Sequence, residues 1–303
     1  MRKLIYLIFL AVLTAGCSGK QKEETAKNSL KDNVELLEMP QIPSEITDPN
    51  QRADYLIIHF WDGLDFTDTL LTYNRDFLEQ NFTNFSQLLI ISNDSTARKK
   101  GALTLMKKAE VDPIVYKTFS EIAYHYLYDP NSPMLDEDSF IPFMEIFQNS
   151  ELLDEAERER NRFLLQNALK NRAGMKAADF TYVNVDGKNT TLYKTPVKGN
   201  LLLIFYDPDC DNCKEIIGKL ADNDAIAEMI NQGDLSLLAI YSGENKELWD
   251  ETAPSLPKEW IVGYNSGSIE DDGSYFFRAS PTIYLLDNNK NVLVKDLSPS
   301  RLP

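Results

Sequence analysis

Two cysteines, Cys210 and Cys213, lie close together in a segment that reads FYDPDCDNCK. Thiols at this CxxC spacing can close and reopen a disulfide, supply part of a metal site, or form a permanent cross-link. The spacing alone is compatible with all three kinds of chemistry, so the surrounding sequence has to distinguish them.

The position of the pair favours redox chemistry. The apolar run Asn200–Tyr206 predicts a strand buried on both faces, and Lys214–Gly233 predicts a helix that ends at a glycine cap. Cys210 then lies at the start of a helix, where free N–H groups and the helix dipole stabilise a thiolate. We therefore predict that Cys210 is the exposed, attacking thiol and that Cys213 is the resolving thiol.

Three aspartates, Asp207, Asp209 and Asp211, crowd Cys210. Like charge disfavours a thiolate, so these carboxylates oppose the helix dipole and tune the acidity of the thiol. A poorly stabilised thiolate makes the reduced pair less favourable, and this makes the pair a better reductant. The aspartates therefore favour a reductase, or a stable disulfide that rarely turns over.

The segment gives less support for a metal site than for a redox-active pair. Structural zinc takes about four ligands, and only the two cysteines are visible as candidates. The aspartates imitate the start of a calcium loop, but Asn212 and Gly218 stand where that loop requires a glycine and a glutamate. The sequence has no glycine-rich phosphate loop either, so we expect neither a metal nor an organic cofactor. A structural disulfide between Cys210 and Cys213 stays open as an alternative.

The third cysteine, Cys17, follows a segment typical of a secretory signal. Met1–Gly16 has a basic start, a short apolar run and small residues before Cys17. This junction resembles the lipobox of bacterial lipoproteins, although Leu13 stands one place earlier than the usual leucine. We therefore predict that Met1–Gly16 is removed and that lipidated Cys17 anchors the protein. Cys210 and Cys213 then remain as the single pair, in an envelope compartment that permits disulfides.

Composition and charge exclude some classes of partner and bear on where in the cell the protein lies. The 303 residues, 43% of them hydrophobic, suffice for two domains with cores of their own. The formal net charge of −16 disfavours nucleic acid and anionic lipid surfaces as partners. No apolar run after the signal is long enough to cross a bilayer. We expect a protein of the bacterial cell envelope held by its lipid. Ser18 after Cys17 favours the outer membrane, without deciding between its periplasmic and surface sides.

The chain divides into four segments. A polar stretch with Pro40 and Pro43 follows Cys17 and predicts a flexible linker. Apolar residues then recur at helical spacing from Asp48 to Arg172. Beyond them, a hairpin turn at Asp186-Gly187 and strands that alternate with helices predict a mixed sheet. We place the signal peptide at residues 1–16, the lipidated cysteine and linker at 17–44, an α-helical domain at 45–173 and an α/β domain at 174–303.

The α/β part resembles the thioredoxin-like superfamily, especially its membrane-tethered, peroxiredoxin-related branch in bacterial envelopes. The resemblance rests on the segments ADFTYVNVDGKNTTL, LLLIFYDPDCDNC and SYFFRASPTIYLLDNNKNVLV. It implies a thioredoxin-like fold, which is an α/β fold with a mixed central sheet flanked by helices, and redox roles for the two cysteines. It also implies that Pro281 is the family's cis-proline and that Ser280 before it supplies backbone contacts for docking a partner.

Three departures limit this resemblance. Asp209 replaces the usual tryptophan before the first cysteine, and Asp211-Asn212 replaces the usual Gly/Pro-rich pair. Asp207 stands where peroxiredoxins have a threonine, which argues against peroxidase activity. The helical part resembles a less characterised domain that precedes thioredoxin-like domains in Gram-negative lipoproteins, on the segment RADYLIIHFWDGLDFTD and the order of domains. That second resemblance implies an N-terminal all-α domain but no chemistry.

These observations predict a lipid-anchored thiol–disulfide oxidoreductase of the bacterial cell envelope. It would exchange the Cys210/Cys213 dithiol and disulfide with partner proteins, leaning towards reductase. An electron donor that the sequence does not identify would reduce it again. The alternative is a non-catalytic binding or scaffold lipoprotein whose thioredoxin-like domain carries a structural disulfide.

Overall fold

The computed structural model describes residues 36–298. The predicted signal peptide, the predicted lipidation site at Cys17 and most of the predicted linker lie outside the described residues. Within residues 36–298, no helix is both long enough and apolar enough to cross a membrane.

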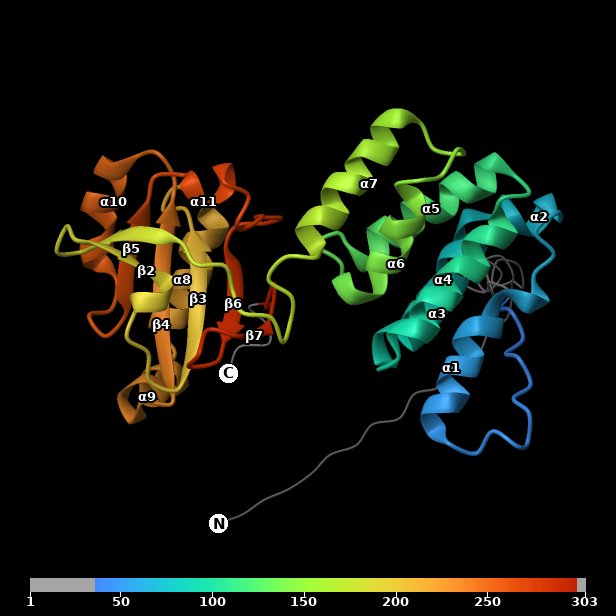
Figure 1. Cartoon of the computed structure of the whole chain (residues 1–303), viewed down its shortest axis with the longest axis horizontal. Helices are drawn as coiled ribbons and strands as arrows, with labels where there is room; N and C mark the ends of the chain where they lie inside the picture. Colours follow the sequence, from blue (N-terminus) through green and yellow to red (C-terminus); the bar gives the residue numbers. More distant parts are fainter. Residues whose placement is uncertain (1–35, 299–303) are drawn as a thin grey trace, which may run out of the picture. The chain divides into compact units, whose positions relative to one another are not determined.

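Helices make up the first half of the described chain (Figure 1). Most begin at an aspartate or asparagine whose side chain accepts a backbone N–H of the first turn, which satisfies a group that the helix leaves unpaired. Asp48 accepts the Gln51 N–H at 3.0 Å, and Asp154 forms a capping box with Glu157. The helices are α1 (Pro49–His59), α2 (Thr69–Thr72), α3 (Arg75–Ile91), α4 (Ser95–Ala109), α5 (Pro113–Leu127), α6 (Glu137–Phe147) and α7 (Glu155–Ala168).

Aromatic rings form the core of this helical part. Trp61 meets Phe85 and Phe119 edge to face, with ring centroids 5.7 and 5.2 Å apart. Phe82 contacts Phe143 with centroids 6.0 Å apart. All five side chains are fully buried, so each removes a large apolar surface from water. Packing against one another therefore accounts for these aromatic residues.

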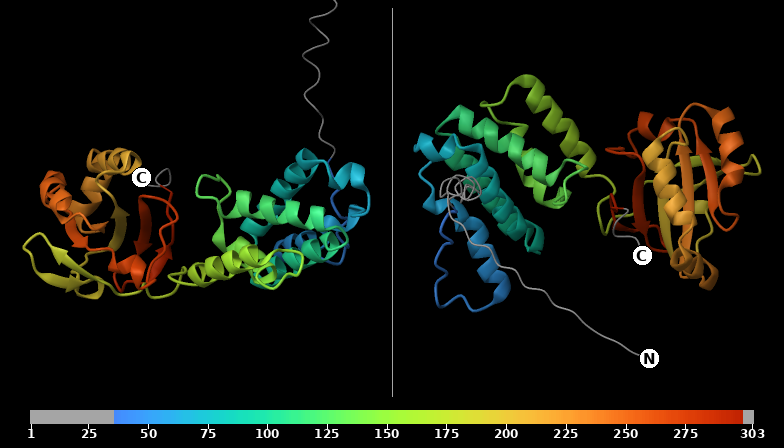
Figure 2. Two further views of the ribbon diagram at one scale, coloured as in Figure 1. Left: turned by 90° about the horizontal axis from the view of Figure 1, so that it is seen from above. Right: turned by 180° about the vertical axis from the view of Figure 1, so that it is seen from behind.

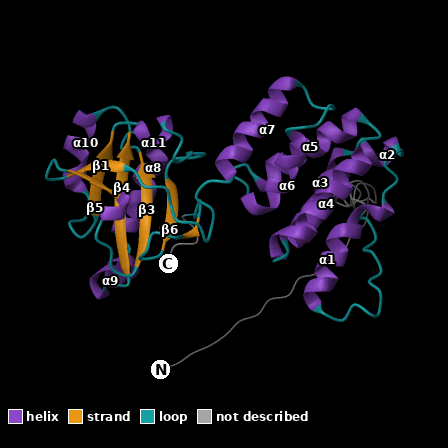
Figure 3. Ribbon diagram, in the orientation of Figure 1, coloured by secondary structure: helices purple, strands orange, loops and turns teal. Residues whose placement is uncertain are grey.

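A mixed sheet of seven strands makes up the second half (Figure 3). Its strand order is β2-β1-β5-β4-β3-β6-β7, in which β3, β4 and β5 run parallel and the other neighbours run antiparallel. Strand β3 is paired on both sides, which explains its continuous apolar sequence. The strands are β1 (Thr181–Asn184), β2 (Asn189–Thr191), β3 (Asn200–Tyr206), β4 (Leu235–Ser242), β5 (Ile261–Asn265), β6 (Thr282–Leu286) and β7 (Val292–Val294).

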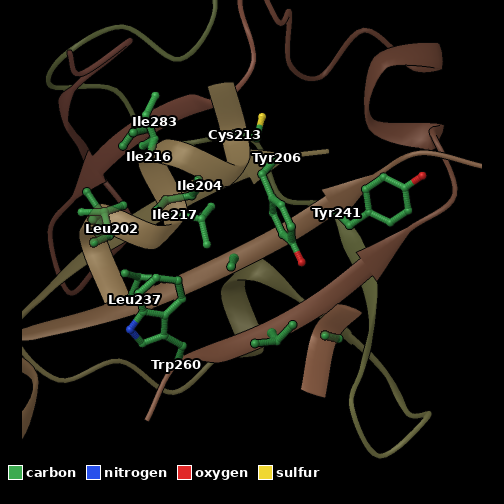
Figure 4. Packing of buried hydrophobic residues seen from close by; sticks show 14 of the residues in the cluster. Leu202, Ile204, Tyr206, Cys213, Ile216, Ile217, Leu237, Tyr241, Trp260 and Ile283 are labelled. Atoms are coloured by element: carbon green, nitrogen blue, oxygen red, sulfur yellow. The ribbon is translucent and has the colours of Figure 1, made fainter. Parts of the chain in front are cut away.

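Both faces of the sheet carry a hydrophobic core. Ile204 packs with Ile216 and other residues of α8 on one face (Figure 4), and Phe205 packs with Tyr275 on the other. Seen from behind, α8 covers one face of the sheet (Figure 2). This architecture confirms the predicted fold class, an α/β part with a mixed, helix-flanked sheet after an all-helical part. The helices of this half are α8 (Asp211–Ala221), α9 (Asp224–Gln232), α10 (Lys246–Thr252) and α11 (Ser268–Asp271).

One predicted helix is wrong in its extent. The segment Lys214–Gly233 forms parts of two helices, because α8 ends at Ala221 and α9 starts afresh. Asn223 causes the break: its side chain accepts the N–H groups of Ala225 and Ile226, which starts a new first turn. Gly233 ends α9 in the left-handed conformation with φ of 82°, as a glycine cap does.

The change from helices to strands falls between α7 and β1, so the predicted boundary between residues 173 and 174 lies in the connecting segment. Whether the two parts fold independently stays a prediction. Several side chains reach across this boundary, and they bear on the site described next.

Candidate functional site

Cys210 occupies the N-cap of α8. Strand β3 ends at Tyr206, and a tight turn follows in which the Cys210 N–H donates to the Asp207 carbonyl at 3.1 Å. The Cys210 Sγ accepts the Cys213 N–H at 3.4 Å, in the role that aspartate or asparagine plays at most other helices of this chain. The sulfur therefore faces the free N–H groups at the start of the helix, where a thiolate is favoured.

The two thiols differ in exposure. Cys210 is partly exposed, whereas Cys213 is fully buried and packs in the core on the α8 face of the sheet, near Tyr206 (Figure 4). Burial raises the pKa of the Cys213 thiol to about 12. A hydrogen bond with the Asp207 backbone opposes this shift, whereas the neighbouring Cys210 and the charge of the Asp207 carboxylate add to it. Both cysteines are free thiols here, which is the reduced state of the pair. One accessible and one protected sulfur fit the predicted attacking and resolving roles.

The three aspartates have different environments. Asp207 is half-buried, and its carboxylate accepts the Asp209 N–H at 2.8 Å, so it shapes the turn before Cys210. Asp209 and Asp211 are exposed, and the Asp211 carboxylate lies 3.6 Å from the Lys214 ammonium. Solvent and a cation therefore screen Asp211, while the charge of Asp207 acts on a buried sulfur.

Ser280 and Pro281 lie directly beside the cysteines, and the peptide bond between them is cis. The Ser280 carbonyl oxygen lies 3.9 Å from Cys210 Sγ. The same oxygen accepts a hydrogen bond of 2.8 Å from the side-chain amide of Asn212. The structure thus brings together the cysteine pair and the predicted docking residues. Sequence reasoning did not single out Asn212, although its place between the cysteines was a usable signal.

The segment before Ser280 is held from several sides. The Tyr275 hydroxyl donates to the Ala178 carbonyl at 2.8 Å, and Phe277 stacks at a tilt on Phe205 with centroids 4.7 Å apart. Arg278 is held by ion pairs and a cation–π contact. It pairs with Asp296 and Glu137 and lies over the Tyr128 ring, with its guanidinium carbon 4.4 Å from the centroid. The backbone beside Cys210 is therefore fixed by contacts from both the sheet and the helical part.

A hollow of about 300 Å³ lies beside Cys213, on the side of α8 that faces α10. Its walls are mostly apolar, and Tyr206, Asp207 and Pro208 contribute to them. Among residues 36–298, no group of three or more histidine, cysteine, aspartate or glutamate side chains could hold a metal ion.

Comparisons with known proteins place this site in context. Residues 16–171 match the family described as a domain of unknown function, DUF5106. The crystal structure of a thioredoxin-like protein from Bacteroides caccae is 34% identical, with a TM-score of 0.78, over 87% of this chain and 95% of that chain. This likeness spans the helical part as well as the sheet, so the predicted thioredoxin-like fold is confirmed.

Two further solved structures match shorter stretches. A conserved protein of unknown function from Bacteroides fragilis is 48% identical over 42% of this chain and 93% of that chain, with a TM-score of 0.40. The thioredoxin domain of a thiol-disulfide oxidoreductase from Bacteroides vulgatus is 18% identical over 42% of this chain and 89% of that chain, with a TM-score of 0.37. No curated protein matches the chain.

Proposed function

The chain belongs to the DUF5106 family and is a thioredoxin-like protein, and from this we propose that it is a thiol–disulfide oxidoreductase of the bacterial cell envelope. It would be anchored by lipid on Cys17, and its Cys210/Cys213 pair would exchange disulfides with partner proteins in the aqueous compartment. The partners would be envelope proteins that carry thiols or disulfides. The asymmetry of the pair carries the proposal: an accessible sulfur at a helix N-terminus stands next to a buried one.

In the reductive direction, the Cys210 thiolate attacks one sulfur of a partner disulfide. A bond forms between Cys210 Sγ and that sulfur, the partner's S–S bond breaks, and its second sulfur leaves as a thiolate that takes up a proton. Cys213 then gives up its proton and attacks Cys210 Sγ, which closes the Cys210–Cys213 disulfide. The partner's first sulfur leaves and is protonated in turn. Two electrons and two protons have then moved from the pair to the partner.

The charges around the pair support a reductive direction of exchange. The nearby carboxylates of Asp207 and Asp209 work against negative charge on sulfur, so the reduced pair gains less than it would in an electropositive site. A pair whose reduced form is weakly stabilised gives up its electrons more readily. We therefore propose that the protein acts as a reductase and that an electron-donor dithiol of the envelope regenerates it.

Measurement of the reduction potential tests this proposal. The chain with Cys17→Ala keeps Cys210 and Cys213 as its only thiols, so alkylation of samples equilibrated in thiol–disulfide buffers reports this pair alone. We expect a potential near that of thioredoxin, about −270 mV, and reduction of insulin disulfides in the presence of dithiothreitol. A bond that mild reductants fail to open, together with no insulin reduction, would instead identify a structural disulfide in a scaffold protein.

A further inference from the structure

The Asn212 side chain bridges the redox site. It lies between the two cysteines, and its Nδ2 donates to the Ser280 carbonyl oxygen at 2.8 Å. The same oxygen lies 3.9 Å from Cys210 Sγ. Asn212 does not cap α8, because the Cys210 sulfur accepts the N–H group that a capping side chain would accept. Its amide is therefore committed to a carbonyl at the point where a partner must approach.

We propose that Asn212 is a specificity-determining residue: it acts as a latch that occupies the Ser280 carbonyl until a polypeptide partner displaces it. This inference rests on the proposed function and deepens it, because it names the class of disulfide that the latch discriminates against. A disulfide in a polypeptide must displace the Asn212 amide from the Ser280 carbonyl, whereas a small disulfide without main-chain N–H groups does not compete for that carbonyl.

The geometry of a mixed disulfide brings the partner to this carbonyl. Two bonded cysteines keep their Cα atoms about 4.4–6.8 Å apart. A partner cysteine joined to Cys210 therefore brings its own main chain, with its N–H donors, close to the backbone nearest to the sulfur. That backbone is Ser280, whose carbonyl is close to Cys210 Sγ. A main-chain N–H of the partner and the Asn212 amide would then compete for the same acceptor.

Release of the latch costs little, which suits a residue that must open in each cycle. Asn212 and Ser280 are both exposed, so water can satisfy the amide once it leaves the carbonyl. A net hydrogen bond in such a place contributes roughly 1 kcal/mol, equivalent to about fivefold in affinity. The latch would therefore weaken binding of polypeptide disulfides by about that factor.

The test compares variants on matched substrates, in the Cys17→Ala chain. Asn212→Ala removes the latch, and Asn212→Gln keeps an amide. Asn149→Ala is the control, since Asn149 also donates its side-chain amide to a carbonyl, that of Glu145 at 3.3 Å, but in the helical part. The substrates are a cyclic peptide disulfide, the same peptide N-methylated on both sides of its cysteines, and bis(2-hydroxyethyl) disulfide.

We expect Asn212→Ala to raise kcat/KM for the unmodified peptide about fivefold, mainly through a lower KM, as one net hydrogen bond predicts. The N-methylated peptide and bis(2-hydroxyethyl) disulfide should change less than about twofold, and Asn149→Ala should change none of the three. Equal losses on all substrates would mean that Asn212 only supports the local structure. A loss confined to the unmodified peptide would mean that Asn212 binds the partner, and either result overturns the latch.

A second measurement separates the latch from the proposed function. In the Cys213→Ser variant, the unmodified peptide is trapped as a mixed disulfide on Cys210, and the side-chain amide of Asn212 is followed by NMR. The latch predicts that hydrogen exchange of this amide is about fivefold slower in the free protein than in the mixed disulfide, as one net hydrogen bond allows. Unchanged exchange overturns the latch even where the enzyme turns over. Release of the amide without turnover of any substrate instead contradicts the proposed function alone.

Discussion

The guanidinium of Arg278 lies 3.6 Å from the carboxylate of Glu137, and both side chains are nearly buried, at 7% and 13% exposure. Glu137 begins α6, and Arg278 stands two residues before Ser280, so this contact joins the helical part to the backbone of the redox site. Lys295 also contacts Glu137, at 2.7 Å, and Asp296 pairs with Arg278. Each charge in this cluster therefore has an opposite partner, as buried charges require.

Removing one charge from this cluster should destabilise the protein. We expect Glu137→Gln to lower the free energy of unfolding by about 3 kcal/mol, because Arg278 and Lys295 would stay buried with one carboxylate fewer. Unfolding in urea, followed by far-UV circular dichroism, measures this change.

The neighbouring residue supplies the control. Asp138 pairs with Arg172 at 2.6 Å, but these side chains are 44% and 38% exposed. Exposed ion pairs contribute little to stability, so Asp138→Asn should lower the free energy of unfolding by less than about 1 kcal/mol. Equal losses in the two variants would show that burial of the Glu137 cluster does not determine its contribution.

Cys210 and Cys213 should differ strongly in their rates of alkylation. Burial raises the pKa of the Cys213 thiol to about 12, so at pH 8 only about one molecule in ten thousand carries its thiolate. Iodoacetamide should modify the partly exposed Cys210 within minutes and leave Cys213 unmodified until the pH approaches 12 or the protein unfolds. Peptide mass spectrometry reports each site. Modification of both cysteines at similar rates near neutral pH would contradict the assigned burial.

The same pKa shift makes the reduced protein sensitive to alkali. The pKa of the Cys213 thiol is near its ordinary value of 9.0 in the unfolded chain, whereas burial raises it to about 12 in the folded protein. Above pH 9 the unfolded state therefore releases a proton that the folded state keeps, and folding stability falls as the pH rises through this window. The oxidised protein has no such thiol, so the contribution of Cys213 to this loss should be absent once the disulfide closes.

Elements with a strong local signal could be predicted from the sequence. The run Asn200–Tyr206 predicts a buried strand, and β3 is indeed buried after Asn200, because it is paired on both sides and covered on both faces. The Asp186-Gly187 turn follows from the positive φ of Gly187, 73°, which glycine adopts without strain. The strand pattern before Cys210 and the helical pattern after it together predict that Cys210 lies at the start of a helix.

Contacts between distant residues could not be predicted in this way. Nothing in the local sequence of Glu137, Arg278 and Lys295 indicates that these charges will be buried together. The bond from Asn212 to the Ser280 carbonyl joins the first turn of α8 to the segment that precedes β6, and only the pairing of β3 with β6 brings these two together. Such pairings depend on the completed fold, so only the structure reveals them.

The proposed lipid anchor on Cys17, which lies outside the described residues, can be tested by cell fractionation. Cys17→Ala should move the protein from the membrane fraction to the soluble fraction of the cell envelope, because several acyl chains on Cys17 would provide the tether. Fractionation followed by immunoblotting measures this, and Cys210→Ala controls for loss of a cysteine elsewhere. Continued sedimentation of Cys17→Ala with membranes would rule out lipid at this residue as the main anchor.

The aspartates around the pair should differ in what they control. Asp207 is half-buried and its charge raises the pKa of Cys213, after the larger effect of burial. Asp207→Asn removes that charge while keeping a side-chain oxygen for the Asp209 N–H. We expect alkylation of Cys213 to begin at a lower pH than in the unchanged protein, because one charge that disfavours its thiolate is gone. The exposed pair, Asp209→Asn with Asp211→Asn, should leave Cys213 unchanged and speed alkylation of Cys210 near neutral pH. Its disulfide should also become easier to reduce, since less negative charge stabilises the thiolate. If the two variants changed both cysteines alike, the carboxylates would act as one diffuse charge, and Asp207 would have no distinct effect on the resolving thiol.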